Sequence, residues 1–172
     1  VAGRAGTTVH RFETNRGQRA AVLAGLACAD AEVACVLDAD LQDDPLDVGE
    51  LVAALAASGA DVVCAGRLGE HESPTRRAQA RIFRRVRWAM SRGRIPPDAG
   101  VFHVATAAAV REMLVVARPG DDPPVAYARS GARIVSIPVA RRPRPTGTSS
   151  YSTVDRLKLA GGSLGGLVAV GR

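Results

Sequence analysis

Two aspartates, Asp38 and Asp40, stand two positions apart directly after the apolar run 33–37. In an extended chain such residues face the same side, about 6.5–7 Å from each other. The pair could therefore hold one divalent cation at the carboxyl end of a strand, because Mg²⁺ and Mn²⁺ prefer carboxylate oxygens and share their other positions with substrate phosphates. This spacing predicts a metal–diphosphate site. An alternative stays open, since aspartates at strand ends also cap helices and form turns.

Two further side chains could act beside such a site. Arg67 follows the predicted strand 61–65, at the carboxyl edge where ligands gather in open α/β sheets, and it could face a phosphate. Asp98 lies just before a glycine, and its carboxylate could deprotonate or orient an attacking group. A simple turn aspartate before glycine is the alternative for Asp98.

Basic segments could meet phosphates or an anionic surface. Arg144, with Ser149 and Ser150, offers a guanidinium fork and hydroxyls suited to phosphate oxygens, although a linker of turn residues has the same composition. The segment 76–94 is crowded with arginines, which would contribute about 1 kcal/mol each at an anionic membrane. Charge alone would also allow nucleic acid, but the few aromatic residues and the absence of a nucleic-acid motif argue against it.

Alternating strands and helices must position these residues. The apolar patterns predict strands at 7–12, 33–37, 61–65, 98–104 and 133–139. Helices are expected over 16–29, 45–58, 76–94, 106–116 and 125–130, followed by a C-terminal helix after residue 150. Strand, helix and strand in this order are typical of a doubly wound α/β sheet, with short apolar strands covered on both faces.

The composition narrows the class of protein. The chain has 172 residues, enough for one domain, and a net charge of +6, which predicts anionic partners. Aromatic residues make up only 3%, which favours an α/β layer structure over a β-sandwich. Three widely spaced cysteines in apolar segments predict reduced, buried thiols and a location in the cytoplasm or on the cytoplasmic face of a membrane. We expect neither a signal peptide nor a membrane span, because no apolar segment is long enough.

Taken together, these motifs resemble the family 2 glycosyltransferases of GT-A type. The likeness runs from about Thr8 to about Leu159 and is greatest for polyprenyl-phosphate sugar transferases, such as dolichyl-phosphate mannose synthase. It rests on Asn15-Arg16-Gly17, Asp38-Ala39-Asp40-Leu41-Gln42, Asp98-Ala99-Gly100 and the segment 144–151. The resemblance implies a mostly parallel, Rossmann-like sheet flanked by helices. It also implies metal-dependent transfer of a sugar, with inversion, from a nucleotide-sugar donor to a polyprenyl phosphate.

The resemblance also assigns roles to individual residues. It implies that Asp38, Asp40 and, more loosely, Gln42 surround Mg²⁺ or Mn²⁺, and that Asp98 lies beside the acceptor. Arg144, Ser149 and Ser150 match a loop that closes over the diphosphate and the acceptor phosphate. Where the family usually has arginine after the phenylalanine of this motif, the chain has His103, which we expect to be an ordinary packed histidine.

One part of the family pattern is not found. Family members open with strands that carry a Pro-x-Tyr-Asn-Glu-like loop for the nucleoside, and nothing before Thr7 matches them. We therefore expect an incomplete GT-A domain over 1–150, lacking the first strands, and a C-terminal helix or tail over 151–172 that could lie on a membrane. A missing pocket wall puts the activity of this chain in doubt. The alternative is a non-catalytic remnant that binds an anionic membrane or a protein partner through the arginine-rich helix.

Overall fold

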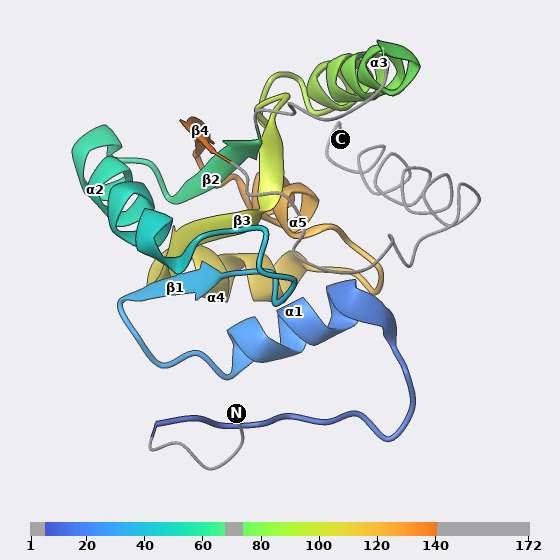
Figure 1. Ribbon diagram of the computed structural model, residues 1–172. Coiled ribbons are helices and arrows are strands. Elements are labelled where there is room, and N and C mark those ends of the chain that lie inside the picture. The colour runs from blue at the N-terminus through green and yellow to red at the C-terminus, as the bar shows by residue number, and fades with distance from the viewer. Residues whose placement is uncertain (1–5, 68–73, 141–172) are drawn as a thin grey trace.

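A computed structural model describes residues 6–67 and 74–140, with a four-stranded sheet at the centre (Figure 1). The strands are β1 (Val33–Val36), β2 (Val62–Arg67), β3 (Ala99–Thr106) and β4 (Ile134–Val139). The helices are α1 (Gly17–Ala27), the 3₁₀ turn η1 (Pro45–Asp47), α2 (Val48–Ser58), α3 (Pro74–Met90), α4 (Ala107–Val116) and α5 (Pro123–Ser130). This arrangement confirms the predicted α/β class and agrees with a GT-A-type fold.

The sheet is mixed, in the order β1-β3-β2-β4. Strand β3 runs antiparallel to both of its neighbours, whereas β2 and β4 pair in parallel, so β1, β2 and β4 share one direction. Val36 near the end of β1 pairs with His103, and Gly66 near the end of β2 pairs with Ala99 at the start of β3. The carboxyl ends of β1, β2 and β4 therefore lie at the same edge of the sheet as the beginning of β3.

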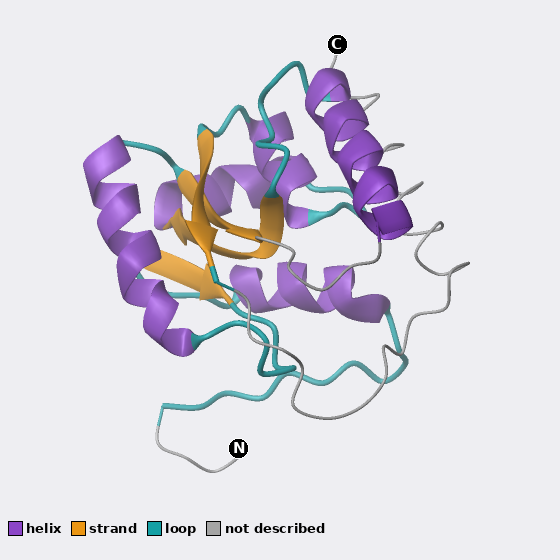
Figure 2. Cartoon of the chain, turned by 45° about the horizontal axis from the view of Figure 1, so that its top comes forward, coloured by secondary structure: helices purple, strands orange, loops and turns teal. Residues whose placement is uncertain are grey.

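Apolar side chains cover both faces of the sheet, as the short apolar strands predict. Along β2, Val62 and Cys64 face a cluster formed with α1, α4 and α5, and Val63 and Ala65 face a second cluster with α2. Figure 2 shows helices on both sides of the strands. This alternation follows from the two-residue period of a strand and fixes which strand residues are buried against which helices.

Local signals account for several helix ends. Pro45 stands in the first turn of η1, where its missing N–H leaves no hydrogen bond unmade, and the Asp44 side chain accepts from the Leu46 amide. Asp44 is therefore the N-cap of η1. Helix α2 ends at Gly59, whose φ of 62° is the left-handed conformation that glycine adopts easily. Thr106 caps α4 as expected, accepting from the Ala109 amide.

The strand at 7–12 and the burial of all three cysteines were predicted wrongly. The segment 7–12 is not a strand; its residues are largely exposed and pair with no strand among the described residues. A local strand-like sequence is not enough, because a strand needs a neighbour to satisfy its backbone. Cysteine burial was also overestimated: Cys64 is buried, but Cys28 and Cys35 are exposed. Cys35 lies on β1, at the sheet edge, which explains its exposure despite apolar neighbours.

A buried ion pair joins α5 to the loop that follows α4. The Arg129 guanidinium donates to both carboxylate oxygens of Asp121, and only 9% and 5% of the two side chains are exposed. Asp121 also accepts from the Arg118 amide, and Arg129 donates to the Val116 carbonyl. On the far side of this loop, Arg19 of α1 donates to the Gly120 carbonyl. The loop 117–122 is therefore fixed from two helices.

Among the described residues, no helix combines the length and the apolar character that crossing a bilayer requires. The expected C-terminal helix or tail over 151–172 lies outside the described residues.

Replacing Asp121 by asparagine should lower the free energy of unfolding by about 3 kcal/mol, because the buried Arg129 would lose its countercharge. Urea denaturation measures the change. Glu112→Gln, on the exposed side of α4, is the matched control and should stay within about 0.5 kcal/mol of the parent. A loss below about 1 kcal/mol for Asp121→Asn would mean that the pair behaves like one on the surface.

Candidate functional site

The residues predicted to do chemistry converge on one edge of the sheet. Asp38 follows β1, Arg67 ends β2 and Asp98 immediately precedes β3. Because β3 runs against its neighbours, its beginning lies beside their carboxyl ends, and all three positions reach the same edge. This edge is where open α/β sheets place ligands. The side chain of Arg67 lies outside the described part of the chain.

Asp38 is held by a residue that sequence reasoning did not single out. Gln18, in the first turn of α1, donates its side-chain amide to Asp38 Oδ1 at 2.8 Å. Asp38 is half-buried. A side chain so oriented keeps its second oxygen in a defined direction, which is what a ligand to a cation needs. Gln18 gave no sequence signal beyond its place after Asn15-Arg16-Gly17.

Asp40 and Gln42 lie in a turn, which changes the geometric basis of the metal prediction. β1 ends at Val36, so Asp38 and Asp40 do not belong to an extended strand. Leu41 has a φ of 62°, and the Asp40 carboxylate accepts from the Gln42 amide at 3.2 Å. The expected same-side spacing of a strand therefore does not apply here. Turns favour short, polar side chains, which accounts for the aspartates at these positions.

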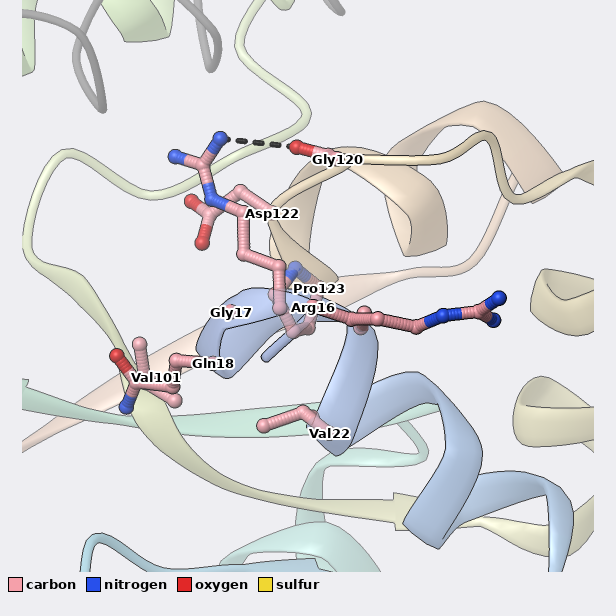
Figure 3. A pocket seen from close by; sticks show the side chains of 10 residues that line it. Arg16, Gly17, Gln18, Val22, Val101, Gly120, Asp122 and Pro123 are labelled. Atoms are coloured by element: carbon pink, nitrogen blue, oxygen red, sulfur yellow. Dashed lines mark hydrogen bonds between the residues drawn. The ribbon is translucent and has the colours of Figure 1, made fainter. Parts of the chain in front are cut away.

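Two adjoining cavities run along this edge. The larger has a volume of about 400 Å³ and is lined by the start of α1, including Gln18 (Figure 3). The smaller has a volume of about 260 Å³ and is lined by Asp98. Val101 and Asp122 line both cavities, so the two are neighbours. The pair of cavities therefore extends from Gln18, which is bonded to Asp38, to Asp98.

Asp98 is exposed to solvent at the rim of the smaller cavity. Its Oδ1 accepts a hydrogen bond of 2.6 Å from the Ser136 hydroxyl on β4. Its Oδ2 lies above Gly66 on β2. The carboxylate thus extends from the start of β3 across β2 toward β4. Such an accessible acceptor can orient or deprotonate a ligand group in the cavity.

Arg87 turns inward from the arginine-rich helix, which the sequence did not predict. Only 7% of this residue is exposed, and its Nη2 lies within 3.3 Å of the carbonyl oxygens of Pro96, Pro97 and Ala99. Burial lowers the pKa of Arg87, and nearby carboxylates oppose the change. The guanidinium stays charged at neutral pH. Together with Arg84 it gives the smaller cavity a cationic wall on the α3 side.

His103 lies at a β-bulge of β3, close to Val101, which lines both cavities. Between the pairs Cys64–His103 and Gly66–Ala99, the register of β3 against β2 shifts. Within this bulge, His103 Nδ1 lies 2.6 Å from the Val101 carbonyl oxygen, so Nδ1 carries the proton and donates. The imidazole is fully buried and meets the Tyr127 ring edge-on, with centroids 5.3 Å apart. The prediction of a packed histidine is confirmed.

The side chains near Asp38 offer the type of oxygen ligand that a hard cation prefers. Asp38, Asp40 and Gln42 offer carboxylate and amide oxygens, the ligands that Mg²⁺ and Mn²⁺ prefer. Within the described ranges, no three His, Cys, Asp or Glu residues gather into a cage that would hold a metal. The remaining positions around a cation would thus belong to ligand phosphates and water, as is usual for Mg²⁺. The metal site stays a prediction.

Arg144, Ser149 and Ser150, of the predicted phosphate loop, lie outside the described residues.

A family model matches the part of the chain that forms this edge of the sheet. The sequence model of the family described as "Glycosyl transferase family 2" matches residues 3–115. This stretch contains the Asp38–Gln42 turn, Asp98 and the whole of β3.

Curated relatives cover more of the chain. A Pseudomonas fluorescens protein named undecaprenyl-phosphate 4-deoxy-4-formamido-L-arabinose transferase is 32% identical over 146 residues, 84% of this chain and 42% of its own length. A Proteus mirabilis protein of the same name is 30% identical over 84% of this chain and 44% of its length. A shorter match, to the protein of that name from Pseudomonas savastanoi pv. phaseolicola, reaches 42% identity over 69 residues. The chain therefore spans less than half the length of the two longer matches.

The buried imidazole makes stability depend on pH. Burial lowers the pKa of His103 to about 4, against about 6.5 when unfolded, while its bond to Val101 opposes the shift. The unfolded state then binds the extra proton between these values, so stability is complete above about pH 6.5 and falls toward pH 4. Between about pH 7.5 and about pH 5 this linkage should cost about 2 kcal/mol.

Urea denaturation at both pH values, in the parent and in His103→Phe, checks the effect. The variant should lose this part of the decline, whereas the exposed-histidine control His10→Ala should keep it. His103→Leu serves as a second variant if phenylalanine does not fit. Equal declines in the parent and both variants would contradict the buried neutral imidazole.

Proposed function

The chain belongs to glycosyl transferase family 2, and from this membership we propose that it transfers a sugar from a nucleotide-sugar donor to the phosphate of a polyprenyl phosphate. The names of the relatives, which specify undecaprenyl phosphate, support this acceptor class. The observation that carries the proposal is the pair of adjoining cavities, with Gln18 at one end and Asp98 at the other. Asp38 does not itself line a cavity, but its carboxylate accepts a hydrogen bond from Gln18. One reaction could then place its donor and acceptor along a single edge.

On the donor side, Asp38, Asp40 and Gln42 are the residues that would hold Mg²⁺ or Mn²⁺. When bound, such a cation neutralises the negative charge that the departing diphosphate gains. Gln18 keeps the Asp38 carboxylate in place through its 2.8 Å hydrogen bond. The larger cavity beside Gln18, about 400 Å³, suits the donor. Arg67, at the end of β2, is proposed to face the diphosphate.

On the acceptor side, the smaller cavity combines Asp98 with Arg84 and Arg87. Guanidinium groups bind phosphate oxygens with charge-assisted hydrogen bonds, so the two arginines would attract the acceptor phosphate. A phosphate is already ionised near neutral pH, and Asp98 would serve mainly to orient the attacking oxygen rather than to remove a proton. We assign Arg144, Ser149 and Ser150 to the same phosphates, as the family likeness implies.

A second candidate function is attachment to an anionic membrane through α3, and one observation favours it. The outer side of this helix exposes large apolar residues between arginines: 64% of Ile82 and 50% of Trp88 are exposed. Arg81 and Arg85 are exposed as well. A basic helix with exposed apolar side chains suits the interface of an anionic bilayer. Peripheral attachment on the cytoplasmic face would also bring the chain to a lipid-linked acceptor.

Binding of UDP or GDP should depend on Mn²⁺, because the cation would bind both the diphosphate and residues 38–42, here called the aspartate turn. Isothermal calorimetry should show heat with Mn²⁺ that is absent when EDTA is present. Asp40→Ala should weaken this binding at least about tenfold, the loss of a charged ligand. Asp47→Ala, an acidic residue on η1 outside residues 38–42, is the control and should bind like the parent. Heat that is independent of metal, or unchanged in Asp40→Ala, would exclude the proposed donor site.

Liposome sedimentation tests the membrane candidate. Vesicles containing phosphatidylglycerol should retain the chain, while phosphatidylcholine vesicles should not, because the arginines of α3 need anionic headgroups. Trp88→Ser should weaken retention about tenfold by removing buried apolar area. Val115→Ser, which is also highly exposed but lies on α4, should have no effect. Equal retention on both kinds of vesicle would rule out this function.

A further inference from the structure

The Asp98 carboxylate is held at a position that its own backbone does not dictate. Asp98 is exposed, and an exposed aspartate ordinarily samples several rotamers. Here the Ser136 hydroxyl, two strands away on β4, donates to Oδ1 at 2.6 Å. Ser136 is paired with Cys64 of β2, so its position is fixed by the parallel part of the sheet.

Gly66 leaves the space that the carboxylate occupies. A Cβ on this residue would lie 2.3 Å from Asp98 Oδ2 and 3.1 Å from the Ile137 carbonyl oxygen. The first distance is far below van der Waals contact, so any larger residue would push the carboxylate away. Gly66 is not needed for an unusual backbone conformation, because its φ is not positive. The glycine therefore leaves room for the carboxylate and, less tightly, for the neighbouring β4 backbone.

The backbone on both sides of Asp98 is fixed separately. Arg87 Nη2 donates to the carbonyls of Pro96 and Pro97 before it and of Ala99 after it. With the backbone held by Arg87, the remaining freedom of Asp98 is rotation of its side chain. The hydrogen bond from Ser136 and the space above Gly66 select one rotamer and so restrict that rotation.

We propose that Ser136 and Gly66 are positioning residues that aim the Asp98 carboxylate into the 260 Å³ cavity, one as a hydrogen-bond donor and the other by leaving room. Their catalytic meaning rests on the proposed transferase function. A hydrogen bond at an exposed site adds little to stability, but it selects one orientation of a charged acceptor. Because a misplacement of about 1 Å can lower a rate about 100-fold, orientation matters more than stability here.

Turnover of a panel of UDP- and GDP-sugars with undecaprenyl phosphate gives the first readout. Ser136→Ala should lower kcat about tenfold, with KM for the lipid changed less than about threefold and an unchanged melting temperature. Ser136→Thr keeps the hydroxyl and should restore most of the rate. Gly66→Ala should lower kcat about 100-fold. Ser58→Ala and Gly49→Ala, on α2 and outside the residues that line the cavity, are matched controls and should keep the kcat of the parent.

The second readout does not need activity. In protein labelled with 13C at the aspartate carboxyl carbon, the Asp98 resonance is the one missing from Asp98→Asn. Ser136→Ala and Gly66→Ala should both shift it by more than its linewidth, while Ser136→Thr and the two controls leave it in place.

The readouts together separate the two proposals. An unmoved Asp98 resonance in Ser136→Ala and Gly66→Ala overturns the positioning role, whatever the turnover. A lower kcat accompanied by a lower melting temperature, with no rescue by threonine, also overturns it, since a structural defect would explain both. If the parent chain turns over no donor but the resonance moves, the positioning stands and the transferase function fails.

Discussion

The reversal of a single strand brings the two ends of the candidate site together. β3 lies between β1 and β2 and runs antiparallel to both, so its first residue reaches the edge at which its neighbours end. Asp98 precedes that residue, and Asp38 follows β1. Had β3 run in the same direction as its neighbours, Asp98 would lie at the opposite edge. Both cavities and the contacts with Gln18 and Ser136 depend on this one strand direction.

Buried polar groups concentrate on the segments that shape this edge. Arg87 binds the backbone on either side of Asp98, and His103 supplies a donor to the carbonyl of Val101 at the bulge. Farther along, the ion pair with Asp121 fixes the loop that carries Asp122 to both cavities. Burying such groups is costly unless they are hydrogen-bonded. Their placement beside the cavities indicates that the fold tolerates this free-energy cost because these groups hold the edge in one conformation.

Much of this fold could be predicted from local sequence, and the site only in outline. Strand and helix patterns located nearly every element because burial on two faces imposes a period on the chain. Asp38 and Asp98 could be recognised by their residue type and neighbours. Local patterns could not reveal that β3 is reversed or that Ser136 lies beside Asp98, since both depend on contacts between distant segments. The prediction of a strand at 7–12 was wrong for the same reason, because a strand-like sequence does not provide a partner strand.

The most direct test of the account is paramagnetic broadening of backbone amide signals by Mn²⁺ in the presence of UDP. The central claim is that the aspartate turn and Asp98 face one shared site. Broadening should therefore be strongest at residues 38–42, extend to 98–101, and spare Gly131 at the far end of α5. Broadening that reaches 38–42 but not 98–101, or that is spread evenly over the surface, would contradict a single site at this edge of the sheet.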